Sequence, residues 1–102
     1  PLASGLLTGK YRKGTAPEGS RLAARLDSVA DETWRQLTEY EELTRSLGLT
    51  PVDATFGWLL AQPVVTSVIA GATTPEQVAA NAAAGRTALD PEAVERIARI
   101  FA

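Results

Sequence analysis

The sequence predicts an α/β protein with a parallel sheet, and three observations support this fold class. The run "VVTSVIAG", which contains a predicted strand at 66–70, is short, rich in β-branched residues and almost continuously apolar. Such runs are typical of strands buried on both faces of a parallel sheet. Helical patterns precede and follow this run, and residues 1–9 look like the end of another strand. Strands that alternate with helices indicate an α/β architecture.

The composition excludes several classes of function. The chain has 102 residues, no cysteine, no histidine and a net charge of −2. This size fits one domain or a piece of a larger one. The charge predicts no nucleic-acid or membrane partner, and the absence of Cys and His predicts no disulfide and no metal site of the usual kind. No signal peptide or membrane span is visible, so we expect a cytoplasmic protein. Because the chain starts at Pro1 rather than Met, we expect a processed or excised piece.

The first 31 residues predict a strand end followed by a long loop. Residues 1–9 are small and apolar, and we expect a strand end and turn there. Residues 10–31 are basic and contain Gly and Pro, which predicts a loop. Long loops in compact domains are often functional, but a solvated connector has the same composition, and both interpretations stay open.

Helices are predicted over 31–61. Asp31 is a candidate N-cap, and Gly48 is the expected residue after the first helix. Apolar residues recur there at helical spacing: Trp34, Leu37, Tyr40, Leu43 and Leu47. The second helix begins with Thr50, Pro51 and Asp53, ends before Pro63, and has Phe56, Leu59 and Leu60 on its apolar face. Trp34 and Trp58 are interpreted as core residues rather than ligand platforms.

Two terminal helices are predicted over 75–101. The first runs from Pro75 to about Ala84 and ends at Gly85. The second starts at Asp90 and has an apolar side made of Val94, Ile97, Ala98 and Phe101. Only two strands are visible in the whole chain, and two parallel strands cannot bury both faces of a sheet. The sequence therefore predicts part of a bigger sheet or barrel.

The junction at 71–81 has two interpretations. Thr74, Pro75 and Gln77 fit a capping box in which the Thr74 hydroxyl accepts from the Gln77 amide and the Gln77 side chain reaches back. Capping does not explain Gly71 or Asn81. A helix start after a parallel strand is also a natural phosphate site, because free N–H groups and the helix dipole favour anions. Both interpretations stay open on the residues alone.

The chain resembles the C-terminal third of an aldo-keto reductase. The resemblance is carried by "PLASGLLTGKY" at 1–11 and "SVIAGATTPEQVAAN" at 67–81, and it extends along the whole chain. It is strongest to the branch that includes voltage-gated potassium channel β subunits and bacterial oxidoreductases. The resemblance implies the last two βα units of a (β/α)8 TIM barrel. It also implies a parent enzyme that uses NADP(H) to reduce an aldehyde or ketone carbonyl, the small-molecule substrate.

The resemblance also implies a set of cofactor-binding residues. The turn after the seventh strand would lie along the pyrophosphate, two basic residues of the 10–31 loop would close over the phosphates, and the 71–81 junction would hold the adenosine end. The residues of the turn are Pro1, Leu2, Ala3, Ser4 and Gly5. The basic residues of the loop are Lys10 and Arg21, and the residues of the junction are Gly71, Thr73, Gln77 and Asn81.

The sequence departs from the family pattern in three places. No Lys or Arg stands at 71–77 to pair a 2′-phosphate, so charge would have to come from Arg21, and NAD(H) is the alternative to NADP(H). Ala80 replaces a Glu that commonly precedes the Asn. The family's catalytic residues lie on earlier strands, so no residue here is assigned as catalytic.

Three hypotheses follow. The chain is the cofactor-binding segment of an enzyme, or belongs to a regulatory subunit that senses the cofactor, like a potassium-channel β subunit. Alternatively, the isolated chain is inactive and associates through unpaired strand edges, either with the missing N-terminal part of the barrel or with itself.

Overall fold

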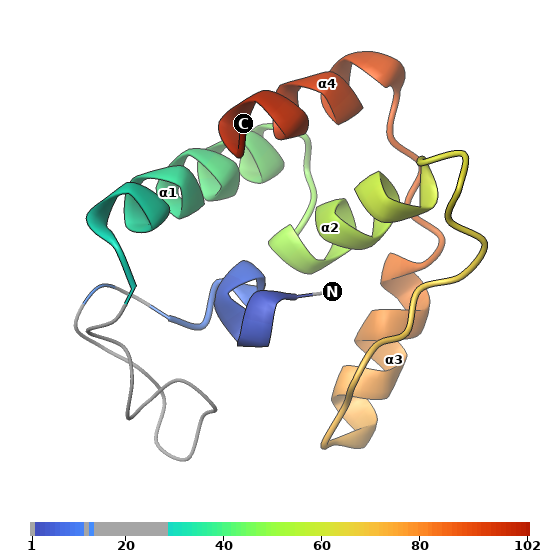
Figure 1. Cartoon of the computed structure of the whole chain (residues 1–102). Helices are drawn as coiled ribbons and strands as arrows, with labels where there is room; N and C mark the ends of the chain where they lie inside the picture. Colours follow the sequence, from blue (N-terminus) through green and yellow to red (C-terminus); the bar gives the residue numbers. More distant parts are fainter. Residues whose placement is uncertain (1, 12, 14–28) are drawn as a thin grey trace. The chain divides into compact units, whose positions relative to one another are not determined.

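A computed structural model of the chain describes residues 2–11, 13 and 29–102. The described residues form one short 3₁₀ segment and four α-helices, with no strand among them (Figure 1). The bounds are η1 Ala3–Thr8, α1 Asp31–Ser46, α2 Pro51–Leu60, α3 Pro75–Ala84 and α4 Pro91–Ile100. The chain divides into two compact units, Leu2–Pro51 and Val52–Ala102, which are described separately.

The strand predicted at 66–70 is not formed. Residues 65–72 have no regular secondary structure, and Figure 1 draws them as a coil before α3. A strand needs a neighbouring strand to pair its backbone groups, and the described residues supply none. Two apolar side chains of the run 64–71 are exposed, with Val64 92% and Ile69 89% accessible, whereas Val65 and Val68 are half-buried.

The strand end predicted at 1–9 is replaced by helical turns. η1 occupies Ala3–Thr8, and its backbone is left-handed at Ala3, Ser4 and Gly5, with φ of 51°, 58° and 95°. Positive φ is incompatible with a strand and is costly for residues that carry a Cβ. The turn itself is held by the N–H groups of Gly5 and Leu7, which both donate to the Leu2 carbonyl at 3.0 and 3.1 Å.

Helix α1 corresponds to the helix predicted over 31–47, but its start differs from the prediction. The N-cap is Ala30, without a side-chain cap, and Asp31 is the first residue of the helix. Asp31 and Glu32 still favour this end, because carboxylates in the first turn interact well with the helix dipole.

Helix α1 ends just before Gly48, as the sequence predicts. Gly48 has φ 73°; its N–H donates to Arg45 O at 3.1 Å and the N–H of Leu49 donates to Thr44 O at 2.9 Å. This pair of bonds is a Schellman motif, which needs a left-handed residue and so favours glycine.

The unit Leu2–Pro51 packs around α1 and Tyr11. Helix α1 buries Leu37, Tyr40, Leu43 and Thr44, on the predicted helical spacing. Tyr40 donates its hydroxyl to Pro51 O at 3.3 Å. Tyr11 is only 3% exposed, and the partly buried Leu6 and Trp34 pack against it. Trp34 therefore belongs to a core, as predicted.

The unit Val52–Ala102 is organised by contacts of α2. This helix buries four consecutive residues, Ala54, Thr55, Phe56 and Gly57. A Cβ at Gly57 would lie 3.0 Å from Thr87 Cγ2, so glycine permits the close approach of the 87–89 segment. Trp58 donates its indole N–H to Val94 O at 3.0 Å, which ties α2 to α4. Both contacts join residues about thirty or more positions apart and so define the core of this unit.

Helix α4 has the predicted start and a slightly different buried face. Asp90 Oδ1 accepts from Ala93 N–H at 2.8 Å, which is an N-cap hydrogen bond. Ala93 and Ile97 are buried, whereas Ala98 is exposed and Phe101 is 40% exposed. Ala93 and Ile97 are four residues apart and therefore lie on one face of the helix. The buried face of α4 is thus rotated toward Ala93 relative to the predicted apolar side.

Candidate functional site

The candidate site begins with the N-terminus of α3. Thr74 is the N-cap with extended backbone, and its Oγ1 accepts from Gln77 N–H at 3.1 Å. Pro75 occupies the first helical position, where its missing N–H costs nothing. This half of the predicted capping box is confirmed, and it fixes the direction in which α3 leaves the preceding segment.

The other half of the capping box reaches one residue further back than predicted. Gln77 Oε1 accepts from Thr73 N–H at 2.6 Å and from Thr73 Oγ1 at 3.1 Å. A capping box would return this side chain to the N-cap residue, Thr74. The amide oxygen of Gln77 therefore fixes Thr73, a residue that the sequence places in the cofactor site.

Asn81 closes the same network from one helical turn further along. Its Nδ2 donates to the carbonyl of Gly71 at 3.1 Å, across ten residues of sequence. The two amide side chains thus hold both ends of the short segment 71–73 against one face of α3. Four of the residues predicted to bind the cofactor are brought together by these bonds: Gly71, Thr73, Gln77 and Asn81.

Gly71 is not required by the local geometry of the chain. Its φ is not positive, and an added Cβ would meet nothing within 4 Å. Gly71, Thr73 and Gln77 are exposed, while Asn81 is half-buried. The network is therefore open to solvent, and small ligands have access to the backbone at Gly71.

The electrostatic character of this region is close to neutral. Between Ala54 and Gly85 the sequence contains a single charged residue, Glu76, which lies in the first turn of α3. Hydrogen-bond donors, rather than basic side chains, are what the 71–81 segment itself offers to an anion.

The second group of predicted cofactor residues lies in the unit Leu2–Pro51. Leu2 precedes η1, and Ala3, Ser4 and Gly5 form its left-handed part. The hydroxyl of Thr8 donates to Gly5 O at 2.6 Å and stabilises this turn. For the non-glycine residues Ala3 and Ser4 this left-handed backbone costs about 1–3 kcal/mol each, and such strain occurs often at ligand sites.

Lys10 lies against this turn. A Cβ at Gly5 would be 2.8 Å from Lys10 Cε, so the lysine stem occupies the space beside the glycine. Its Nζ lies 5.3 Å from the centroid of the Tyr11 ring, within the range of a cation–π interaction. Gly5 and Lys10, both predicted at the phosphates, are thus brought together. The buried Tyr11 under Lys10 was missed in the sequence analysis, and no periodic pattern there signals it.

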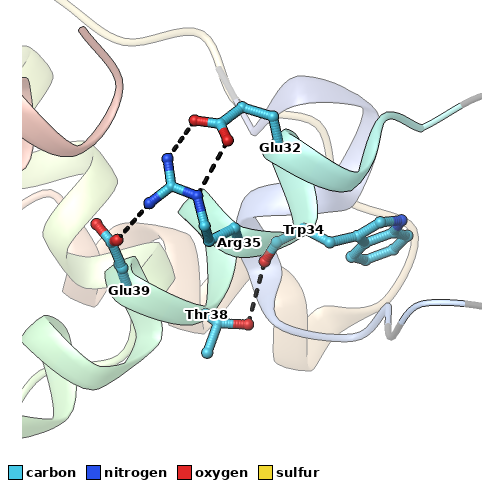
Figure 2. A network of polar contacts seen from close by, with 5 residues as sticks. All are labelled: Glu32, Trp34, Arg35, Thr38 and Glu39. Carbon is cyan, nitrogen blue, oxygen red and sulfur yellow. Dashed lines mark hydrogen bonds and ion pairs between the residues drawn. The ribbon is translucent and has the colours of Figure 1, made fainter.

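Two other cations of this unit, Arg35 and Lys13, are paired with carboxylates. Figure 2 shows Arg35 between Glu32 and Glu39 on α1; its Nη1 donates to Glu39 at 2.7 Å and its Nε donates to Glu32 at 3.0 Å. Hydrogen bonding to Arg35 lowers the pKa of Glu32, and hydrogen bonding to Glu32 raises the pKa of Arg35. Lys13 pairs with Asp31 at 2.7 Å. Among the described residues no carboxylate is paired with Lys10.

Two of the predicted cofactor residues, Pro1 and Arg21, lie outside the described residues. In the described ranges no group of His, Cys, Asp or Glu is arranged to hold a metal ion. Within the same ranges no helix has the length and apolar character needed to cross a membrane.

Comparison with known proteins extends over the whole chain. The model of the aldo/keto reductase family matches residues 1–102. A putative voltage-gated potassium channel subunit beta of Schizosaccharomyces pombe is 36% identical over 111 residues, covering 99% of this chain and 32% of that protein. An uncharacterized oxidoreductase of Bacillus subtilis is 37% identical over 101 residues, covering 99% of this chain and 30% of its own length.

An enzyme is among the relatives as well. The L-glyceraldehyde 3-phosphate reductase of Escherichia coli O157:H7 is 38% identical over 89 residues, covering 79% of this chain and 25% of the enzyme. The chain spans a third or less of the length of these relatives. Since the family model covers every residue, the chain belongs to the aldo/keto reductase family.

Proposed function

We propose that the chain is the cofactor-binding C-terminal segment of an NADP(H)-dependent aldo-keto reductase built on a TIM barrel. The observation that carries the proposal is the hydrogen-bonded group at the start of α3, in which Gln77 and Asn81 hold Thr73 and Gly71. Family membership supplies the reaction class. When bound, the nicotinamide cofactor supplies hydride to an aldehyde or ketone carbonyl.

The residues at 71–81 fit the adenosine end of such a cofactor. Asn81 uses one N–H on Gly71, which leaves an amide oxygen and a second N–H. An acceptor beside a donor is the arrangement that binds the N6 and N7 edge of adenine. Gln77 retains its amide NH₂ for acceptors such as ribose or phosphate oxygens. The open space at Gly71 lets a ligand approach the backbone there.

The turn at 2–5 fits the pyrophosphate. Its small residues expose backbone, and Lys10 lies beside Gly5 with no carboxylate partner in the described part of the chain. A lysine ammonium is a compact charge suited to phosphate oxygens. Pro1 and Arg21 join this group on the family resemblance, Pro1 in the turn and Arg21 in the loop that closes over the phosphates.

The charges favour NADP(H) only through the loop at 10–31. Glu76 is the single charge between Ala54 and Gly85, so the 71–81 segment has no cation for a 2′-phosphate. Arg21 is the residue we assign to that role, and NAD(H) is the cofactor expected if Arg21 does not fill it.

The chain's own residues bind and orient the cofactor, and none of them is assigned a chemical step. We therefore propose that the isolated chain does not reduce carbonyls. An NADPH-dependent reductase assay that detects turnover by the 102-residue chain would contradict this statement.

A second candidate is a regulatory subunit that binds the same cofactor. It is favoured by the 36% identity to a protein described as a potassium channel subunit beta. The two candidates differ in the rest of the barrel: an intact set of catalytic Asp, Tyr, Lys and His favours the enzyme. A third candidate is self-association through the unpaired segment that contains Val64 and Ile69, which are exposed.

The test of cofactor binding is a titration of NADPH and NADH into the complete protein of which we propose this chain is a part. Gln77→Ala, Asn81→Ala and Arg21→Ala are compared with wild type. We expect each to weaken NADPH binding by about three- to thirtyfold, the loss that one or two hydrogen bonds or an exposed ion pair produces.

The cofactor preference separates the roles of these residues. Arg21→Ala should weaken NADPH more than NADH, and an equal loss would show that Arg21 does not recognise the 2′-phosphate. Thr38→Val, on the exposed side of α1, is the control. Unchanged affinity in all three site variants would refute the site.

A further inference from the structure

The hydrogen bonds at the start of α3 use up the donors of Thr73. This residue has one N–H and one O–H, and both donate to Gln77 Oε1, at 2.6 and 3.1 Å. Neither is left to donate to a ligand in this arrangement. A direct contact from Thr73 to the cofactor as a donor would have to replace one of these two hydrogen bonds.

The same bonds determine which atoms of Gln77 remain for a ligand. Its backbone N–H is held by Thr74 Oγ1 and its side-chain oxygen by Thr73. The opposite branch of the amide, Nε2, carries two hydrogens and has no partner among the described residues. A side-chain amide that no hydrogen bond holds can rotate by 180° and present either its oxygen or its nitrogen to a ligand. With Oε1 held twice, Gln77 presents donors.

We propose that Thr73 is a positioning residue that acts on the cofactor through Gln77. It holds the amide so that Nε2 meets acceptor atoms of the ligand, the ribose and phosphate oxygens of the adenosine end. Holding the side chain beforehand also removes part of the rotamer entropy that Gln77 would lose on binding. This inference rests on the proposed function, since it concerns the same site.

The test is a double-mutant cycle on NADPH binding in the complete protein. Thr73→Val keeps the shape of the side chain and removes the hydroxyl. We expect it to weaken NADPH binding by about three- to tenfold, the usual effect of one hydrogen bond. Thr73→Ser restores the hydroxyl and should retain most of the affinity. In a Gln77→Ala background, Thr73→Val should change the affinity by less than about twofold, because the residue through which it acts is gone.

The matched control is Thr38→Val, which makes the same substitution on exposed α1 surface. Independent, additive effects of Thr73→Val and Gln77→Ala would show that Thr73 contacts the cofactor itself and would overturn the inference. So would an unchanged affinity in Thr73→Val, or a loss in Thr73→Ser as large as in Thr73→Val.

A measurement without cofactor separates this inference from the proposed function. Amide hydrogen exchange at Thr73 should speed up in Gln77→Ala and stay slow in Gln77→Glu, whose carboxylate still accepts both hydrogen bonds. If exchange at Thr73 is unaffected by Gln77→Ala, the positioning contact is wrong. If exchange responds but wild type binds neither NADPH nor NADH, the contact is right, while the proposed function and the role of Thr73 in binding both fail.

Discussion

Helix α2 is followed in the same unit by the segment 61–73, and the two differ in the burial of their side chains. Helix α2 buries four consecutive residues and is tied to α4 by the Trp58 hydrogen bond. The following segment leaves Val64 and Ile69 exposed. A helix forms its backbone hydrogen bonds within itself, whereas a strand forms them with neighbouring strands. Segment 64–70 is therefore the part of this unit whose apolar side chains the proposed barrel would bury.

The same comparison explains which predictions from sequence succeeded. Gly48, Thr74 and Asp90 were read correctly because each acts on backbone within a few residues. The strand predicted at 66–70 is absent from the described residues, which offer it no partner strand. The left-handed Ala3 and Ser4 could not be foreseen, since neither residue type favours positive φ.

The arrangement of the candidate site at 71–81 could also be predicted only where it depends on local sequence spacing. The i,i+4 spacing of Gln77 and Asn81 predicts a shared helix face. Their hydrogen bonds to Thr73 and Gly71 could not be predicted, because they depend on the path of an irregular segment. Whether these residues bind a cofactor stays a prediction.

The largest expected effect contrasts the two phenylalanines of the unit Val52–Ala102. Phe56→Ala should lower the free energy of unfolding by about 3–5 kcal/mol, because it leaves a cavity where Phe56 is 97% buried, with 3% exposed. Phe101→Ala removes the same atoms from a side chain that is 40% exposed, and should cost about 1 kcal/mol or less. Urea unfolding followed by circular dichroism measures both. Equal losses would contradict the placement of the core in α2.

Gly71 extends the comparison to the irregular segment. Since a Cβ there meets nothing within 4 Å, Gly71→Ala should leave folding stability within about 0.5 kcal/mol of wild type. If the cofactor approaches the backbone at Gly71, the added methyl should weaken NADPH binding roughly tenfold, as an overpacked contact does. Isothermal titration calorimetry of the complete protein tests this, and an unaltered affinity would remove Gly71 from the site.

The cap of α3 is expected to have a smaller effect. Thr74→Ala removes the acceptor of the Gln77 N–H and should destabilise α3 by about 1 kcal/mol, while Thr74→Ser should retain most of the stability. Amide exchange rates along 75–84 measure the effect. Unchanged rates in Thr74→Ala would show that the network of Gln77 and Asn81 holds the helix start without the cap.

The smallest effect concerns Glu32 on the exposed side of α1. The hydrogen bond from Arg35 lowers the pKa of Glu32 below its ordinary value of 4.5. The pair therefore stabilises α1 fully at pH values above 4.5, and this contribution is lost as the pH falls through the lowered pKa. Arg35→Gln should raise the titration midpoint of Glu32 toward 4.5, as followed by carboxyl carbon NMR shifts. An unmoved midpoint would mean that the ion pair in Figure 2 does not persist in solution.

The most direct test of the central claim is hydrogen–deuterium exchange of the complete protein with and without NADPH. Cofactor binding should slow exchange in 71–74 and in 2–10, where the adenosine and pyrophosphate groups are proposed to lie, and should leave α4 at its unliganded rate. NADPH binding that leaves exchange in 71–74 unchanged would contradict the assignment of the α3 network to the cofactor.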